Sequence, residues 1–351
     1  MDPLTHALSG ALLVRATAPL PRSQAELPLR FRVAAGFVAA AFPDLDFALR
    51  LIDTLTYLNW HQGPTHSLLL MPVWAWVLAY LFFCFSRGKY HWKLFYFPVC
   101  LGIAIHIIGD LVTAYGLMLF APISTQRFYL PFAFVIDPWF SAIIIAGLVT
   151  SWIFPRKRVA AIFSLIGLVG YVVFLWMLHD RAISIGQEYA NTQLLTRAEV
   201  YVLPQPLSPF HWKIIIKNDE TYQVALITLW QGHNKSLQDT DTGLLKKMAA
   251  AYQPFNRINW QHLAQFGNES VESELVREAW NHPVFANFRR FSVFPQLDRV
   301  DKYEKKVCVW FFDLRFKFPG LPPSFRYGMC RKSNDLSGWH MQRQRGTFWL
   351  D

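Results

Sequence analysis

Residues 102–116 read GIAIHIIGDLVTAYG, an apolar segment that carries one histidine and one aspartate, His106 and Asp110. The two are four residues apart, so on a helix both side chains lie on one face, about one turn from each other. The surrounding apolar stretch, 94–120, is long enough to cross a bilayer. Ionisable groups are costly at membrane depth and need an explanation. We expect either a metal-ligand pair or a buried His–Asp hydrogen bond that only fastens helices.

The apolar residues are concentrated in the first half of the chain. The 351 residues are 53% hydrophobic and 17% charged. Residues 1–179 hold 12 Lys and Arg with 7 Asp and Glu, whereas residues 180–351 hold 22 and 17. This contrast predicts a mostly α-helical integral membrane domain over residues 1–180 and a smaller α+β soluble domain over residues 181–351.

About four apolar stretches of the first domain are predicted to cross the membrane as helices. They cover residues 67–85, 94–120, 138–154 and 159–178. Two shorter apolar helices, at about 4–18 and 33–49, precede them and are near the lower length limit for a span. We expect these two to be re-entrant or tucked against the other helices.

The second domain shows the pattern of a mixed α+β fold. Its β-branched and aromatic runs predict strands at 212–217, 221–230 and 306–318. Helices are expected near 243–252 and 271–280, and residues 181–199 are expected to extend the last span.

The basic residues of the first half orient its helices. Ten of the twelve lie in alternate connections between the apolar segments, and such connections face the cytoplasm. The stretches 43–66 and 121–137, and everything after residue 178, then face outward. This predicts a multi-pass protein of the bacterial inner membrane with its C-terminal domain on the periplasmic side. The same clustering argues against nucleic-acid binding despite the net charge of +10.

The four cysteines do not show zinc-knuckle spacing, so cysteine metal ligation is not expected. Cys84 and Cys100 fall in apolar segments and are expected to be core residues. Cys308 and Cys330 fall in the soluble half. A bridge between them requires an oxidising compartment, and the sequence leaves its formation open.

Several side chains with metal-binding chemistry fall in the outward half of the first domain, although the basic residues alone set the orientation. They are His6, Asp44, Asp46, His61, His66, His106 and Asp110. The D-x-D pattern in FPDLD (42–46) is typical of hard oxygen ligands, but also of a helix cap or turn. A set of His and Asp without Cys suits zinc or a harder divalent ion. We therefore predict a shared divalent-metal site.

Other polar residues are candidates for roles around that site. A carboxylate among Asp46 and Asp137 is expected to act as general base, with helix capping as the alternative for Asp137. Ser67 opens a span after the Gly-Pro turn of HQGPTHS (61–67), where helix amides favour anions, and is a candidate for substrate binding. Arg289 and Arg315 are candidates for binding a substrate headgroup, with a salt-bridge network as the alternative.

Four motifs together carry a family resemblance. MDPLTHALSGALL (1–13), FPDLD, HQGPTHS and HIIGDLVTAYG (106–116) resemble the YdjM-type family of predicted membrane-bound metal-dependent hydrolases. The resemblance covers residues 1–180 strongly, and it continues more thinly through SPFHWKI (208–214) and DLRF (313–316).

The His-x-x-x-Asp helix, the early histidine and the separate Asp and His are more distantly similar to the zinc-dependent phospholipase C/P1 nuclease superfamily. Those enzymes hydrolyse phosphoesters at a zinc cluster in an α-helical fold. This similarity implies one to three zinc ions, with ligands from His6, Asp44 or Asp46, His66, His106 and Asp110. The late ligand group of those enzymes is not evident in this sequence.

These observations and resemblances predict a membrane-embedded hydrolase that uses a metal-activated water. The expected substrate is a phosphoester or other ester of a lipid-like molecule at the outer leaflet, so membrane lipid and a small-molecule or lipid substrate are the expected partners. The alternatives are a structural membrane protein fastened by its metal and an ion transporter. A transporter would require the ligands to continue toward the cytoplasmic side.

Overall fold

The structure is a computed structural model that describes residues 1–19, 27–154, 158–230, 243–267, 273–303, 306–332 and 338–344. The chain divides into two compact units. Unit 1 holds Met1–His179 with Pro204–Pro209, and unit 2 holds Asp180–Leu203 with Phe210–Asp351. Residues 271–272, the start of one predicted helix, lie outside the described residues.

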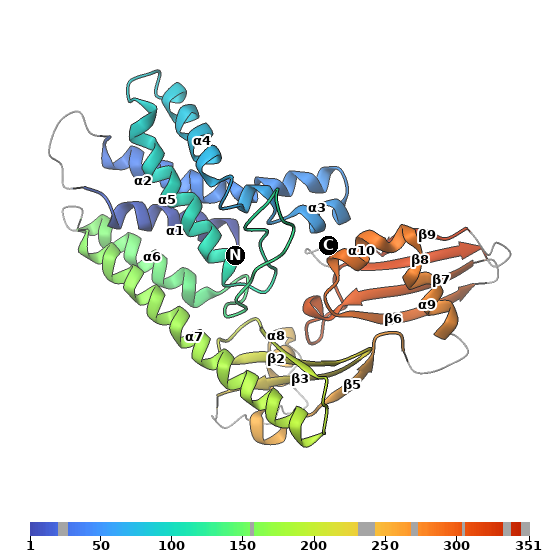
Figure 1. The fold of residues 1–351 in the computed structure, drawn as a ribbon. Helices are drawn as coiled ribbons and strands as arrows, with labels where there is room; N and C mark the ends of the chain where they lie inside the picture. Colours follow the sequence, from blue (N-terminus) through green and yellow to red (C-terminus); the bar gives the residue numbers. More distant parts are fainter. Residues whose placement is uncertain are drawn as a thin grey trace. The chain divides into compact units, whose positions relative to one another are not determined.

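Unit 1 is built from helices, with an irregular segment over residues 112–137 (Figure 1). Its α-helices are α1 (Pro3–Ala16), α2 (Leu29–Ala41), α3 (Thr54–Trp60), α4 (Met71–Phe85), α5 (Trp92–Leu111), α6 (Pro138–Ile153) and the first part of α7 (Val159–Thr192). Two 3₁₀ helices, η1 (Pro43–Leu51) and η2 (Pro64–His66), lie between α2 and α4. The predicted short helices at 4–18 and 33–49 correspond to α1 and to α2 with η1.

Two helices of the described chain, α5 and α7, are long and apolar enough to cross a membrane. Thr54–His66 and α4 would add a third span if this pair, bent by 80°, is counted as one. Helix α6 is apolar but has only 16 residues, so the prediction of four spans is not confirmed. The predicted span 94–120 is too long, because α5 ends at Leu111 and the chain then turns through Gly116, whose φ is +96°.

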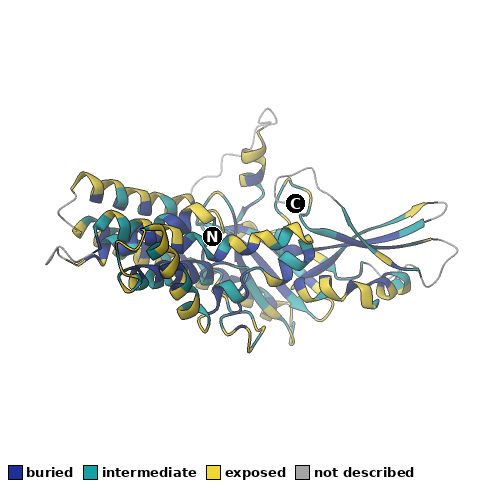
Figure 2. Ribbon diagram, turned by 90° about the horizontal axis from the view of Figure 1, so that it is seen from above, coloured by how far each residue is buried: buried dark blue, intermediate teal, exposed yellow. Residues whose placement is uncertain are grey.

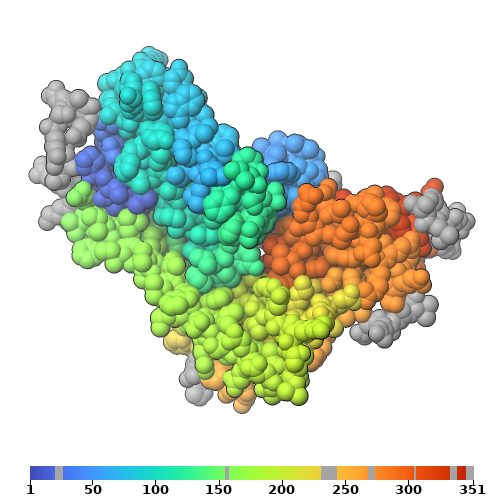
Figure 3. All heavy atoms as spheres, viewed as in Figure 1, coloured from blue at the N-terminus to red at the C-terminus, as the bar shows by residue number. Residues whose placement is uncertain are grey.

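The helices of unit 1 enclose two apolar clusters. One joins α2, α4 and α5 through side chains such as Ala39, Leu78 and Phe95, and α4 and α5 lie side by side (Figures 1 and 3). The other joins α1, α6 and α7 through side chains such as Leu12 and Ile144. Helices α1 and α5 also contact each other. This contact joins the two clusters, because α5 belongs to the first and α1 to the second.

Glycines permit the close approach of α1, α2 and α5. A Cβ atom on Gly10 would overlap the carbonyl oxygen of Gly36, and one on Gly102 would lie 2.6 Å from the same oxygen. No real side chain tolerates such distances, so these three positions set how closely the three helices pack.

Unit 2 contains two sheets and short helices (Figure 1). The first sheet is built from β1 (Glu199–Pro204), β2 (His211–Asn218), β3 (Thr221–Thr228), β4 (Gln253–Pro254) and β5 (Gln261–Ala264), in the order β1-β2-β3-β4 with β5 also paired to β3. The second has the order β6 (Pro295–Tyr303), β7 (Lys306–Asp313), β8 (Arg326–Lys332) and β9 (His340–Gln344).

Helices and 3₁₀ turns connect these strands. They are α8 (Leu244–Ala250), α9 (Ser273–Asn281), α10 (Ala286–Phe291), η3 (Phe255–Arg257), η4 (Pro283–Phe285) and η5 (Leu314–Phe316). The strands include long buried stretches (Figure 2), and most residues of β2 and β7 are buried. The predicted strand 306–318 is correct only to Asp313, where β7 ends. The Asp313 side chain accepts from the amide of Arg315 and so caps the turn η5 that follows.

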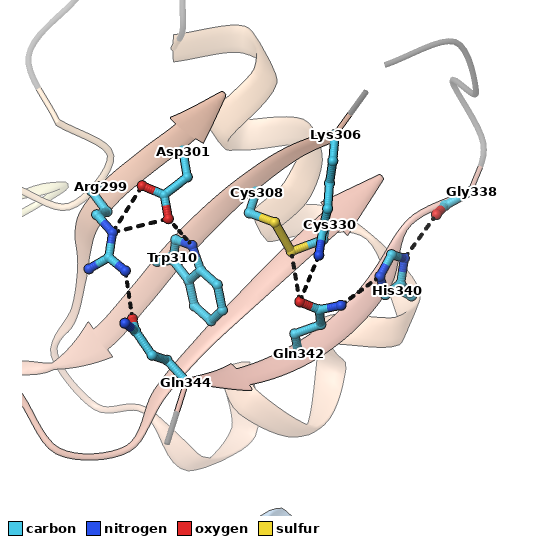
Figure 4. The surroundings of a disulfide bond; sticks show 10 residues. All are labelled: Arg299, Asp301, Lys306, Cys308, Trp310, Cys330, Gly338, His340, Gln342 and Gln344. Atoms are coloured by element: carbon cyan, nitrogen blue, oxygen red, sulfur yellow. Dashed lines mark hydrogen bonds and ion pairs between the residues drawn. A yellow bond between two sulfur atoms is a disulfide. The ribbon is translucent and has the colours of Figure 1, made fainter. Parts of the chain in front are cut away.

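A disulfide joins Cys308 of β7 to Cys330 of β8 (Figure 4). The two residues stand directly opposite each other in the antiparallel pair. Both are buried beside Trp310, so the bridge lies within the sheet rather than at its edge.

Replacement of Gly10 by alanine is expected to destabilise the protein, because the added Cβ overlaps Gly36. Overpacking of this kind costs about 1–3 kcal/mol, and it should appear as a lower melting temperature of the detergent-solubilised protein. The matched control is Gly170→Ala in α7, where an added Cβ meets nothing within 4 Å and helix propensity improves. Equal melting temperatures for the two variants would contradict the proposed close packing.

Candidate metal centre

Four side chains of unit 1 bring their ligand atoms together. They are Asp44, His66, His106 and Asp110, and one ligand atom from each lies within 4.8 Å of all the others. The two histidine Nε2 atoms are 2.9 Å apart, and Asp110 Oδ2 lies 3.2 Å from His66 Nε2 and 3.4 Å from His106 Nε2. Asp44 Oδ1 lies 3.9 and 3.7 Å from the same two nitrogens. We call these four residues the metal cluster.

Local sequence explains how each element presents its ligand. Helix α5 carries His106 and Asp110 one turn apart, as their spacing predicts. Pro43 begins η1 and places Asp44 in its first turn. The Gly63-Pro64 turn begins η2, which holds His66; a Cβ on this glycine would lie 2.6 Å from the carbonyl oxygen of Trp60.

The ring of His106 is oriented by the backbone of α2. Its Nδ1 lies 2.6 Å from the carbonyl oxygen of Ala40. A carbonyl oxygen only accepts hydrogen bonds, so Nδ1 carries the proton and donates it. The neutral ring therefore presents an unprotonated Nε2 to the other three residues of the metal cluster, as a histidine that binds a metal does.

The ring of His66 is oriented by a longer chain of contacts. The Thr65 hydroxyl donates to Asp46 Oδ2 at 3.2 Å, so its oxygen accepts from Nδ1 of His66 at 2.9 Å. This assignment leaves Nε2 of His66 unprotonated as well. Two nitrogen lone pairs then face each other at 2.9 Å with no proton between them, an arrangement that a cation would stabilise.

Two buried oxygen atoms near the cluster also lack a hydrogen-bond partner among the described residues. They are Oδ2 of Asp44 and the side-chain oxygen of Gln62. The Gln62 amide nitrogen donates to Asp110 Oδ2 at 2.7 Å, so this side chain lies at the cluster. A buried polar atom without a partner is costly. The orphaned oxygens and the His₂Asp₂ donor set both fit a divalent ion.

His6 lies beside the metal cluster rather than within it. Its Nε2 is 2.9 Å from Asp110 Oδ1, and its ring stacks on His106 with centroids 3.7 Å apart. The amino group of Met1 donates to the same oxygen. Asp110 thus turns Oδ2 toward the cluster and Oδ1 toward His6. Gly109 leaves room for this, since a Cβ there would lie 3.2 Å from the His6 ring.

Asp46 and His61, two further predicted ligands, form a pair next to the cluster. His61 Nδ1 lies 2.8 Å from Asp46 Oδ1, and Asp46 Oδ2 accepts from the Gln62 amide at 3.0 Å. Burial raises the pKa of Asp46, but the hydrogen bond and charge of His61, with smaller contributions from His66 and Gln62, outweigh it and hold this pKa below its usual value. At Asp44 burial dominates and raises the pKa to about 6.

The other predicted site residues are engaged elsewhere. Asp137 caps α6 by accepting from the amides of Trp139 and Phe140, and it also accepts from the Tyr171 hydroxyl at 2.9 Å, so its capping alternative describes what the structure shows. The Ser67 hydroxyl donates to the carbonyl oxygen of Ala121 at 2.6 Å.

The two predicted substrate-binding arginines lie in unit 2 and are bonded there. Arg289 donates to the carbonyl oxygens of Trp280 and His282. Arg315 pairs with Asp313 at 3.1 Å, which is the salt-bridge alternative.

Gln62 and Thr65 were not among the predicted site residues, although both lie inside the motif HQGPTHS. Gln62 has a positive φ of 60°, which non-glycine residues seldom adopt. Such strained positions gather at functional sites. The sequence carries no signal for this conformation, and only the contacts of Gln62 reveal its place.

Comparisons with known proteins agree with the four motifs. The family described as YdjM inner membrane protein matches residues 1–182. Over 325 residues the chain is 21% identical to the Bacillus subtilis (strain 168) protein named Uncharacterized protein YfhP, and this match covers 92% of the chain and 89% of that protein. No solved structure matches the chain.

The purified protein is expected to carry a divalent metal that is lost when a cluster residue is removed. His106→Ala and Asp110→Ala should each reduce metal content by at least tenfold, because each removes a ligand and leaves a neighbouring buried ligand without its partner. Elemental analysis by mass spectrometry measures this directly. The control is His262→Ala, an exposed histidine of β5, which should keep its metal. Unchanged metal in both cluster variants would refute the assignment.

Proposed function

We propose that this chain, which belongs to the YdjM inner membrane protein family, is a membrane-embedded metal-dependent hydrolase. The observation that carries the proposal is the pair of histidine Nε2 atoms, 2.9 Å apart, beside the carboxylates of Asp44 and Asp110. The hydrogen bonds of the two Nδ1 atoms assign both Nε2 atoms as unprotonated. The ion that suits two imidazoles and two carboxylates is zinc or a harder divalent metal.

Asp44, His66, His106 and Asp110 would hold the ion. When bound, a divalent metal lowers the pKa of a coordinated water and polarises an ester or phosphoester oxygen. The chain supports this chemistry by fixing its ligands before substrate arrives. Ala40 orients His106, Thr65 and Asp46 orient His66, and Gln62 orients Asp110.

The pair of His61 and Asp46 is the proposed general base. His61 Nδ1 donates to Asp46 Oδ1, which leaves His61 Nε2 as the atom that takes a proton from water. The His61 side chain is 16% exposed, so water reaches it, whereas the cluster histidines are fully buried. In this arrangement Asp46, one of the two carboxylates expected from the sequence as a base, acts by orienting and stabilising His61.

An amphiphilic substrate fits the surroundings of the metal cluster. Helix η1, which carries Asp44, also exposes apolar side chains, with Leu45 at 66%, Phe47 at 54% and Leu51 at 91%. Exposed apolar groups beside a polar site favour a molecule with both characters. We therefore retain an ester or phosphoester of a lipid-like molecule at the outer leaflet as the substrate class.

We also propose that the C-terminal domain is periplasmic and that α6 completes four spans. The Cys308–Cys330 disulfide supports this orientation, because such bridges persist in oxidising compartments. The distribution of basic residues supports it independently.

A metal-fastened structural protein is the second candidate. Four protein ligands of which three are fully buried are typical of closed structural sites. The two functions differ at His61, which a structural site does not need.

Replacement of His61 by alanine is expected to slow hydrolysis strongly while leaving the metal bound. General bases contribute roughly 10²–10⁴-fold to rate, so kcat toward phosphodiester and carboxylester substrates, including lipid esters, should fall by about that factor. Metal content should remain at the level of the unmodified protein, and His262→Ala should be unaffected in both assays. A metal-loaded protein without activity on any of these esters would favour the structural function.

Orientation is tested by thiol labelling in a variant that lacks Cys84 and Cys100. In cells with a permeabilised outer membrane, an impermeant maleimide should label Cys308 and Cys330 only after treatment with an impermeant reductant. Inside-out vesicles should give no labelling under the same treatment, because the domain is then enclosed. Labelling of the vesicles, without prior reduction, would place the domain in the cytoplasm.

A further inference from the structure

Unit 2 contains a pocket of about 580 Å³ that the metal cluster does not involve. It is lined by residues of β2, β3, β5 and the segment around η5. This volume falls within the range that holds small organic ligands.

One wall of the pocket carries a buried lysine. Lys213 of β2 is 3% exposed, and its ammonium group donates to the carbonyl oxygens of Leu314 at 2.8 Å and Lys317 at 2.5 Å. Among the described residues no carboxylate lies within ion-pair distance of it. An ammonium group has three hydrogens, so one donor remains after these two bonds.

The other charged groups of the lining have the same sign. Lys317 and Arg257 line the pocket as exposed cations, and the residues that line it include neither aspartate nor glutamate. Polar amides from Gln253, Asn259 and Gln261 complete the polar part. Three cations in a lining that has no carboxylate of its own make a region that attracts anions, although the charge of Asp313 outside the lining also reaches Lys213.

The rest of the lining is apolar. Val224 and Leu226 of β3, Leu263 of β5, and Phe318 and Leu321 after η5 face the pocket. Such a surface adds nothing to the binding of a free inorganic anion, whereas an alkyl chain binds more tightly there because its methylene groups are removed from water.

We propose that this pocket binds an anionic amphiphile, with its phosphate or carboxylate head beside Lys213, Lys317 and Arg257 and its alkyl chain against the apolar wall. The site is distinct from the metal cluster and does not depend on the proposed hydrolase activity.

The protonation of Lys213 fits such a ligand. Burial lowers the pKa of this lysine to about 7, the charge of Lys317 lowers it further, and that of Asp313 opposes the shift. A bound anion favours the charged form. With a headgroup that stays monoanionic, binding should therefore weaken as the pH rises through about 7 and the free lysine loses its proton.

The experiment measures hydrogen exchange of the full-length protein in dodecyl maltoside. Added dodecyl phosphate should slow exchange of backbone amides in 253–263 and 314–321, and inorganic phosphate alone should have a much weaker effect. Lys213→Met should raise the concentration needed for half-maximal protection by about tenfold or more, since a charge-assisted hydrogen bond is lost.

Two further variants keep the result interpretable. Lys317→Ala combined with Arg257→Ala changes only exposed rim positions and should also weaken protection, even if Lys213→Met does not fold. Lys332→Ala, an exposed lysine of β8 outside the pocket, should leave it unchanged. Absence of protection in the unmodified protein would overturn the proposal. Equal protection by inorganic phosphate would overturn its apolar half and leave a free anion as the ligand.

Discussion

The close approach of α1, α2 and α5 at three glycines is the constraint on which the rest of unit 1 depends. Gly10, Gly36 and Gly102 bring the backbones together where side chains would keep them apart. That approach puts the Ala40 carbonyl of α2 against the ring of His106 on α5, and it brings His6 of α1 onto Asp110. Small residues at helix contacts are the usual means of tight packing in membrane proteins. Here they also determine the tautomer of a candidate ligand.

The electrostatics of the metal cluster follow from this packing. His66 and His106 are fully buried, and the unpartnered Oδ2 atom of Asp44 is buried as well, so water cannot compensate for the facing lone pairs or for this oxygen. Polar groups in such a place are stable only when each finds a partner. Hydrogen bonds to the Ala40 carbonyl and to the Thr65 hydroxyl satisfy the Nδ1 atoms of His106 and His66 and leave their Nε2 atoms for a cation. The cluster is therefore built as a set of ligands and not as a self-satisfied hydrogen-bond network.

The residues of the candidate site and several secondary-structure elements could be predicted from the sequence. The i, i+4 spacing of His106 and Asp110 places both on one face of α5. The charge pattern predicted that Asp44 and His66 fall in the same half of the domain as this pair, and the structure brings the four ligand atoms together. The hairpin of β2 and β3 followed from β-branched content, and its structure confirms the predicted strands. These features are local or periodic, so they can be read along the chain.

Features that depend on contacts between distant segments could not be predicted. The stretch 112–120 is as apolar as a span, yet Leu117 pairs with Phe128 in an isolated bridge. The backbone amide of Met118 donates to the carbonyl of Gln62, beside the metal cluster. Gln62 donates to Asp110, which lies 48 residues later in the chain, and no sequence spacing predicts such a contact. Likewise, only the contacts of Asp137 with the amides of α6 and with the Tyr171 hydroxyl show that this side chain caps α6.

The break between η2 and α4 has a consequence for biogenesis. Irregular backbone within a membrane protein must find its hydrogen bonds inside the protein. At this break, the amide of Leu68 donates to the carbonyl of Leu119, and Met118 donates to the carbonyl of Gln62. Residues 118 and 119 leave the ribosome only after α5 has been made. The bent pair of helical segments that carries His66 therefore lacks these two hydrogen bonds until α5 and the residues after it have been made. The metal ligands are thus brought together late in synthesis rather than in the order of the sequence.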